Sequence, residues 1–423
     1  MAASFDYAVV YTVNAICRTP LRTGDADGEV DQILRYKDKT PFIQGNSISG
    51  AFRGWLEKNV GEEVAGELFG SQEKEGYLII SDGVFARDAK ISDRPGIVID
   101  KHTGTAKQGG KFDTKHIDVG AEMKFSVIWT GWKQDAEQAN LVEEMLSAMN
   151  EGEIRLGAKK TNGMGTFKLQ VHRRSFDLRK EPDRKAWLDE SDEGASIELK
   201  KLPRKIYTEF VLTGRLDSIL VKAAVATRSE KDEGRCIENM KEGNVAIIPG
   251  SSVKGAVRTR VEAIADLMGV SSELVTDMFG NEAADNQTQK AGKLYFEDVF
   301  MDPENEGKSI TRIRINKFTG GVIRGGLFQE KPLSAEVQIR IRVPDEPAYC
   351  MLILYALRDL GAGLYNLGSG GAIGRGYFKA ASVEATDSKN ERVNLTFDEA
   401  GNCRCVDEKK KIAKWSRGLE AYR

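Results

Sequence analysis

The chain carries the same series of short motifs twice, and this internal repeat constrains its fold more than any other feature. The segment PFIQGNSISGAFRGWLE, from Pro41, returns as AIIPGSSVKGAVRTRVE from Ala246, 205 positions later. The string ELFG, ending at Gly70, returns as DMFG, ending at Gly280. Motifs that recur in a fixed order at a nearly constant period indicate a duplicated structural unit.

Two further motifs extend the repeat toward the end of each half. IVIDKHTGTAKQGGKF returns as IRINKFTGGVIRGGLF, with Thr103 and Thr319 216 positions apart. LGAKKTNGMGTF returns as LGSGGAIGRGYF, with Gly157 and Gly368 211 positions apart. The offsets drift only by insertions of loop size, so we expect two copies of one fold.

The length of 423 residues suits two domains of ordinary size. We predict a first domain over residues 1–178 and a second over residues 206–386. The segment 179–205 between them is charged and holds two prolines, which predicts a linker. Residues 387–423 are polar and lysine-rich, and we expect a peripheral C-terminal tail.

Each half follows the same order of predicted elements. DYAVVYTVNAI and TEFVLTGRL alternate apolar and polar residues, which predicts an opening strand. SISGAFRGWLEKNV and SSVKGAVRTRVEAIADLM have helical apolar spacing, each with a serine just ahead of the first turn. YLIISDGVF and LYFEDVF predict strands with Asp82 and Asp298 near their ends. The order β–α–β…β–α–β predicts an α+β fold of two tandem ferredoxin-like, RRM-like domains.

Composition excludes several classes of protein. The net charge of −2 argues against a polycation that binds nucleic acid over its whole surface, although local basic stripes remain compatible with RNA binding. No apolar run approaches the roughly 18 residues of a membrane helix, and the N-terminus lacks a signal-peptide pattern. Five cysteines without CxxC spacing give no reason to expect structural zinc. We expect a cytoplasmic protein.

The turn before the first helix of each half predicts a phosphate-binding site. A glycine–serine turn leading into a helix presents unpaired backbone N–H groups to an anion. In the second half two cations four residues apart share one helical face. An ordinary capped helix is the alternative. The predicted RNA contacts are Ser47, Ser49 and Arg53 in the first half, and Ser251, Ser252, Lys254 and Arg258 in the second.

The glycine-rich ends and the segments between strands predict further RNA contacts. Glycine lets a backbone approach another chain closely because it has no Cβ, although many such strings are only tight turns. The third motif predicts a basic hairpin projecting from each sheet. The candidate cations are Lys159, Lys160 and Arg375 beside the glycine-rich ends, and His102, Lys107 and Arg324 in the hairpins.

The helix motif, the segment with Thr103 or Thr319 and the glycine-rich end, in this order, resemble the RAMP superfamily of CRISPR proteins. The resemblance covers nearly the whole chain, apart from linker and tail. Both halves look like the backbone subunit of type III effector complexes, fused as in the double backbone subunits of type III-D systems. The resemblance implies an RRM-like palm, a thumb hairpin and a face that binds crRNA. It also implies complementary single-stranded target RNA and other type III subunits as partners.

The resemblance further implies that a loop aspartate before the helix motif cuts the target RNA. Asp31 matches that position best, with Asp25 and Asp27 nearby, and Asp232 is the candidate in the second half. Because the reference pKa of aspartate is about 3.9, a lone aspartate is a poor general base. We expect it to orient the 2′-hydroxyl or to help hold a divalent cation, Mg²⁺ by the resemblance. An inactive second half, a non-catalytic crRNA scaffold and a guide-processing ribonuclease remain alternatives.

Overall fold

The computed structural model describes residues 5–24, 33–71, 73–100, 106–189, 194–200, 207–221, 227–228, 235–281, 290–302 and 308–423. The chain divides into two compact units. Unit 1 comprises Met1–Arg94, Asp113–Lys160 and Met164–Pro203, and unit 2 comprises Pro95–Phe112, Thr161–Gly163 and Arg204–Arg423. The division after Pro203 falls inside the range 179–205 that was predicted as a linker.

Unit 1 is built on an antiparallel sheet around one long central strand. β1 (Tyr7–Cys17) pairs with β7 (Glu122–Gly131) on one side and with β8 (Phe167–Asp177) on the other. The strand order is β2-β4-β7-β1-β8-β9, and β3 also pairs with β7. The shorter strands are β2 (Phe42–Ile43), β3 (Leu78–Ile80), β4 (Gly83–Phe85) and β9 (Ala195–Ile197).

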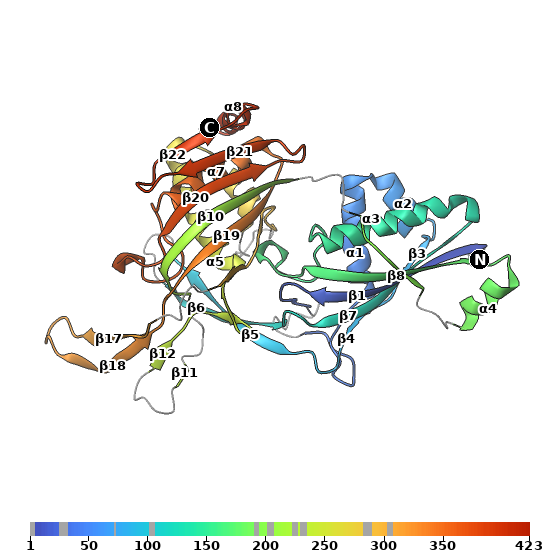
Figure 1. The fold of residues 1–423 in the computed structure, drawn as a ribbon, viewed down its shortest axis with the longest axis horizontal. Coiled ribbons are helices and arrows are strands. Elements are labelled where there is room, and N and C mark those ends of the chain that lie inside the picture. The colour runs from blue at the N-terminus through green and yellow to red at the C-terminus, as the bar shows by residue number, and fades with distance from the viewer. Residues whose placement is uncertain are drawn as a thin grey trace. The chain divides into compact units, whose positions relative to one another are not determined.

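Helices cover one face of this sheet (Figure 1). They are α1 (Gly45–Asn59), α2 (Glu62–Phe69) and α3 (Ala139–Asn150). The side chains of β1 that face them alternate along the strand and are fully or almost fully buried, as the sequence period predicted. These side chains are Val9, Tyr11, Val13, Ala15 and Cys17.

Unit 2 repeats this plan. Its central strand β10 (Tyr207–Ile219) pairs antiparallel with β19 (Leu333–Pro344) and β20 (Phe378–Thr386), in the order β15-β19-β10-β20-β21-β22. The other elements are β13 (Lys241–Glu242), β14 (Val245–Ile248), β15 (Tyr295–Phe296), β16 (Val299–Met301), β21 (Arg392–Phe397), β22 (Cys403–Val406), α5 (Gly250–Met268), α6 (Ser272–Phe279), α7 (Pro347–Gly361) and α8 (Lys411–Glu420). Short 3-10 helices lie at Lys133–Gln138, Lys160–Asn162 and Gly371–Ile373.

In both units the first strand lies between the third and the last of the principal strands, with a helix after the first strand and another before the last. This is the ferredoxin-like arrangement, so the predicted fold class is confirmed. The predicted hairpins are also present. β5 (Ile91–Ile99) and β6 (Ala106–Ile117) form the first, and β17 (Ile310–Ile315) and β18 (Val322–Glu330) form the second. The β17–β18 arm extends away from the sheet of unit 2 (Figure 1). β12 (Arg235–Ile237) pairs with β18 in this arm, and β11 (Thr227–Arg228) pairs with β12.

The segment predicted as a linker contains regular structure. α4 (Glu181–Asp189) places the Trp187 ring edge-on against Phe176 and Phe5, with ring centroids 5.3 and 6.3 Å apart. β9 then extends the sheet along β8. Aromatic packing and backbone pairing therefore hold much of this charged segment on unit 1.

The C-terminal segment also differs from the peripheral tail expected over residues 387–423. β21 and β22 widen the sheet of unit 2, and α8 buries Trp415 and Leu419 in its core. The Asp407 carboxylate accepts the N–H groups of Lys411 and Ile412, which starts the helix. The sequence prediction missed this because only two side chains in the helix are buried, among lysine, serine, arginine and glutamate residues.

None of the described helices combines the length and apolar composition needed to cross a bilayer.

We expect Trp415→Ala to lower the free energy of unfolding of unit 2 by about 3–5 kcal/mol, the range for removing a buried large aromatic side chain. Trp415 is 5% exposed and packs on Phe210, with ring centroids 5.9 Å apart. Urea unfolding of the full chain measures the change, with the exposed neighbour Lys414→Ala as control. Equal stability of the two variants would show that α8 is not part of the core.

Candidate nucleic-acid interface

The first helix of each unit starts on an aspartate from a neighbouring strand connection. Asp82 Oδ1 accepts the N–H of Gly45 at 2.8 Å, and Asp298 Oδ1 accepts the N–H of Gly250 at 2.7 Å. A carboxylate at a helix N-terminus satisfies a free donor and balances the positive end of the helix dipole. The two capping contacts are equivalent in the two repeats.

This arrangement corrects two expectations. The serines do not precede the helices: α1 begins at Gly45 and α5 at Gly250, so Ser47, Ser251 and Ser252 lie within the first turn. The strands predicted from YLIISDGVF and LYFEDVF are each interrupted, as β3 and β4 and as β15 and β16. The capping aspartate lies in this interruption, where its carboxylate reaches the N–H group at the start of the helix.

Glycine is required where each helix starts. A Cβ at Gly45 would lie 2.5 Å from the carbonyl oxygen of Ile80, and one at Gly250 would lie 2.5 Å from that of Phe296. Backbone atoms cannot give way to such a contact. The repeated glycine therefore lets the helix begin directly against the end of a strand.

The repeated arginine of the helix motif binds the protein's own backbone. Arg53 donates to Glu57 Oε1 at 2.9 Å and to the Gly70 carbonyl at 3.1 Å. Arg258 donates to Glu262 Oε1 at 2.9 Å and to the Gly280 carbonyl at 3.2 Å. In each unit the guanidinium links the first helix to the end of the second.

The other polar residues of the helix motif differ in exposure. Ser47 and Ser251 are exposed, whereas Ser49, Ser252 and Lys254 are half-buried. Lys254 Nζ donates to Thr161 Oγ1 at 3.1 Å within unit 2. Burial, and then the nearby charge of Arg258, lowers the pKa of Lys254 to about 8.

The glycines of the terminal motifs bring their loops against the chain's own backbone. A Cβ at Gly157 would lie 2.2 Å from the Arg22 carbonyl oxygen, and one at Gly368 would lie 2.8 Å from that of Leu220. Both have positive φ, at 76° and 74°. The close approach predicted from these glycines is therefore one within each unit.

The cations beside the glycine-rich ends are held by the protein. Lys159 Nζ donates to Thr114 Oγ1 at 2.8 Å. Burial, and then the charge of Lys58, lowers the pKa of Lys160. Arg375 is only 6% exposed and forms an ion pair with Glu330 at 2.7 Å. Arg375 thus supports the base of the second arm, since Glu330 ends β18.

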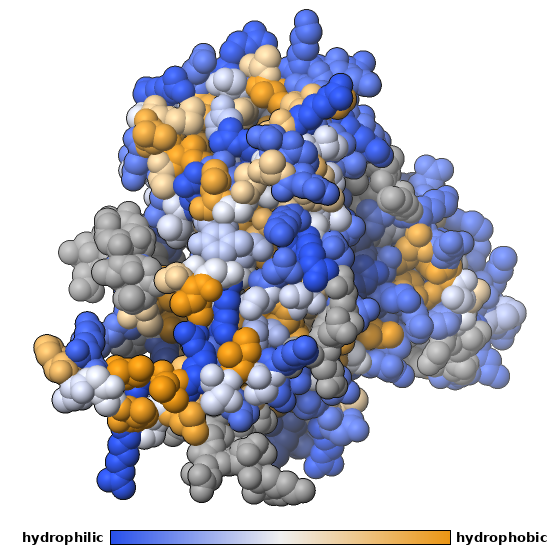
Figure 2. All heavy atoms as spheres, turned by 60° about the vertical axis from the view of Figure 1, so that its left-hand side comes forward, coloured by the Kyte–Doolittle hydropathy of each residue, from blue (hydrophilic) through white to orange (hydrophobic). Residues whose placement is uncertain are grey.

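Both arms carry exposed cations and exposed apolar side chains. Lys107 lies on β6 and Arg324 on β18, and both are exposed, whereas His102 lies outside the described residues. Apolar side chains gather on the β17–β18 arm, at the lower left of Figure 2. Those at least 42% exposed are Ile310, Ile313, Ile315, Phe318, Val322, Ile323 and Leu327, and Phe318 reaches 96%. Cations beside apolar side chains suit contacts with phosphates and bases.

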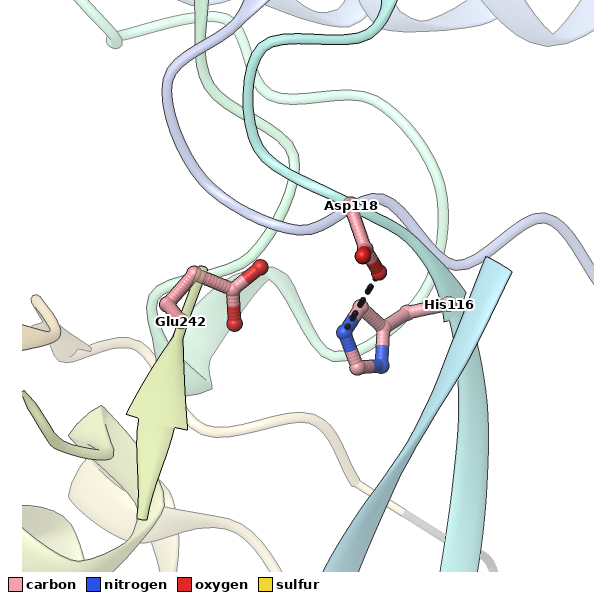
Figure 3. Close-up of side chains that lie close together, drawn as sticks. All are labelled: His116, Asp118 and Glu242. Carbon is pink, nitrogen blue, oxygen red and sulfur yellow. Dashed lines mark ion pairs between the residues drawn. The ribbon is translucent and has the colours of Figure 1, made fainter. Parts of the chain in front are cut away.

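A buried pair fixes the base of the first arm (Figure 3). His116 Nε2 lies 3.4 Å from Asp118 Oδ1, and His116 is 3% exposed. Ser92 Oγ donates to Asp118 Oδ2 at 2.8 Å, which links the start of β5 to the end of β6. The histidine is therefore a structural group of the arm.

The predicted catalytic carboxylates Asp25, Asp27, Asp31 and Asp232 lie outside the described residues. Their roles rest on the sequence alone.

The described geometry thus defines a tandem ferredoxin-like protein with two projecting hairpin arms and the same helix-capping contacts in both repeats. The family model for the RAMP superfamily matches residues 15–168 and again residues 234–379, and the chain belongs to that superfamily as two tandem copies. A search of curated proteins finds no match.

Arg53→Ala and Arg258→Ala should each lower the free energy of unfolding by about 1–3 kcal/mol, because each leaves a backbone carbonyl at the end of the second helix without its donor. Glu57→Ala and Glu262→Ala are matched controls. They remove the partly exposed i,i+4 pair, which is worth about 0.3–0.5 kcal/mol. Chemical unfolding measures both sets, and equal losses from arginine and glutamate variants would contradict the role of the carbonyl contact.

Proposed function

We propose that this chain is a backbone subunit of a type III CRISPR ribonucleoprotein. In this proposal it binds crRNA along its two RAMP domains and cleaves complementary target RNA at regularly spaced sites. The observation that carries the proposal is the duplication itself: two RAMP matches in tandem on two copies of one fold. A polymeric ligand with a regular repeat suits a protein that presents the same surface twice.

The contacts expected with RNA come from two places in each repeat. The arms offer exposed cations such as Lys107 and Arg324, which neutralise phosphates. The first turns of α1 and α5 offer the serines Ser47 and Ser251, exposed beside the capped helix start. Arg53, Arg258 and Arg375 contribute by holding these elements in place, since their guanidinium groups contact the protein itself.

For cleavage we propose the loop aspartates, Asp31 with Asp25 and Asp27 in the first half and Asp232 in the second. A carboxylate there would orient the attacking 2′-hydroxyl toward the adjacent phosphorus. The same carboxylates would hold a divalent cation, which when bound supplies positive charge to the phosphate oxygens. This makes the chain a metal-dependent endoribonuclease that acts within the assembled complex.

Cleavage of end-labelled target RNA by the reconstituted complex tests the catalytic part. We expect Asp31→Ala to remove one discrete product and Asp232→Ala to remove another, with both variants still retaining guide RNA. Asp88→Ala, at an exposed aspartate between β4 and β5, is the control. An unchanged product ladder from both variants would assign cutting to another subunit and leave this chain as a crRNA-binding scaffold.

The pKa of Lys254 predicts that the proposed RNA binding depends on pH. With a pKa of about 8 its ammonium is mostly charged at pH 7 and mostly neutral at pH 9. If only the charged form contacts a phosphate, RNA affinity should follow the charged fraction of Lys254. That fraction falls about ten-fold between these pH values. Lys254→Arg should remove the fall by keeping its charge, and Lys254→Ala should bind weakly but at a constant level. Fluorescence anisotropy with labelled RNA measures all three, and a wild-type affinity that is flat over this range would exclude the contact.

A further inference from the structure

A short hairpin in unit 1, residues 34–43, comes just before α1 and is held rigidly. Tyr36 N–H donates to the Thr40 carbonyl at 3.0 Å, and Phe42 N–H donates to the Leu34 carbonyl at 3.1 Å. The Asp38 carboxylate closes the turn by accepting the N–H and the hydroxyl of Thr40 at 3.1 and 2.9 Å. The tip of this hairpin therefore has a defined shape before any ligand binds.

The hairpin presents a tyrosine whose ring is fixed at two points. The Tyr36 ring stacks on Phe42 with centroids 4.0 Å apart and an interplanar angle of 7°. Its hydroxyl donates to Asp82 Oδ2 at 2.7 Å. Tyr36 nevertheless remains 38% exposed. An exposed aromatic ring held in one orientation loses little conformational entropy when a planar group stacks on it.

The same Asp82 carboxylate connects the ring to the start of α1. Its Oδ1 accepts the N–H of Gly45, and its Oδ2 accepts the hydroxyl of Tyr36. The ring thus has a fixed position relative to the first turn of the helix, where Ser47 is exposed.

Three cations alternate with the ring along the hairpin. Arg35, Lys37 and Lys39 are all exposed, and Asp38 is the single acid among them. An aromatic surface surrounded by cations is the combination with which proteins bind single-stranded nucleic acid: bases stack on the ring, and phosphates contact the charges.

The corresponding hairpin of unit 2 lacks this chemistry. β13 and β14 pair in the same place before α5, but the segment from Lys241 to Ile248 has no aromatic residue. Lys241 forms an ion pair with Glu238 at 3.2 Å, and Ile247 is fully buried. Because the backbone hairpin is present in both units, the fold alone does not require the exposed tyrosine and its cations.

We propose that the hairpin at residues 34–43 is a binding element for single-stranded RNA, in which one base stacks on Tyr36 and the flanking phosphates contact Arg35, Lys37 and Lys39. The inference rests on the proposed RNA binding of the chain and adds a site for a base to it. The contact tolerates any base, because every base has a stacking face.

The test compares two labelled 20-nucleotide probes of equal charge on the full chain. One is single-stranded oligoadenylate, and the other is the same ribose-phosphate chain without bases. Tyr36→Leu keeps Phe42 covered but removes the aromatic ring. We expect it to weaken oligoadenylate binding on the order of ten-fold, as for the loss of one stacked base, and to change binding of the abasic chain less than about two-fold. Tyr36→Phe should bind both probes within about two-fold of the wild type.

Two controls accompany these variants. Tyr422 is 39% exposed, nearly the same as Tyr36, and Tyr422→Leu should leave both affinities unchanged. The double variant Lys37→Ala, Lys39→Ala should reduce the slope of log affinity against log salt by about 0.7 for each lost phosphate contact, on both probes.

Each remaining result decides the matter. A wild-type chain that binds neither probe overturns the proposed function together with this inference. Wild-type binding with Tyr36→Leu unchanged on both probes overturns the hairpin alone. An equal loss of affinity for both probes from Tyr36→Leu overturns base stacking, because the abasic probe has no base to stack. The ring would then affect binding only by supporting the fold of the hairpin.

Discussion

One carboxylate contact organises each half of this molecule. Asp82 and Asp298 interrupt a strand and accept the first N–H of α1 and α5. Because this contact joins the sheet to the start of a helix, it fixes where the helix begins and how its first turn faces solvent. The glycines at these positions allow the close approach of the helix to the strand end. Arg53 and Arg258, further along the same helices, link them to the end of the second helix of each unit. Two equivalent capping contacts, with their aspartates 216 positions apart, are hard to explain except by duplication.

The distribution of charge agrees with the proposal that the protein binds RNA at a few defined positions. The chain has a net charge of −2, and several of its cations bind partners within the protein, as the buried pair of Arg375 and Glu330 illustrates. Among the exposed cations are Lys107 and Arg324 on the arms and Arg35, Lys37 and Lys39 on the hairpin before α1. Such a surface would bind RNA at particular positions and would not attract it over long distances. Long-range attraction of RNA would require a large excess of positive charge.

The sequence predicted the parts of the fold that depend on periodicity. Alternation in β1 and β10, helical spacing in α1 and α5 and repeated glycines sufficed for two ferredoxin-like domains with arms. It missed contacts between residues far apart in the chain. Nothing near Arg258 in sequence indicates that its partner is the Gly280 carbonyl, and the two buried side chains of α8 are too few to mark a core helix. The recurrence of Asp82 as Asp298 was visible, but its role required the geometry of both strand ends. Similarly, the ring of Tyr36 is defined by Phe42 and by the distant Asp82.

The burial of α8 has a consequence for how the chain matures on the ribosome. All residues of unit 1 precede Arg204, so they are synthesised before the main part of unit 2. Unit 2 cannot complete its core until Trp415 has emerged to cover Phe210. A nascent chain that stalls before Trp415 emerges would therefore carry all the residues of unit 1 tethered to an open unit 2, the kind of intermediate that chaperones retain.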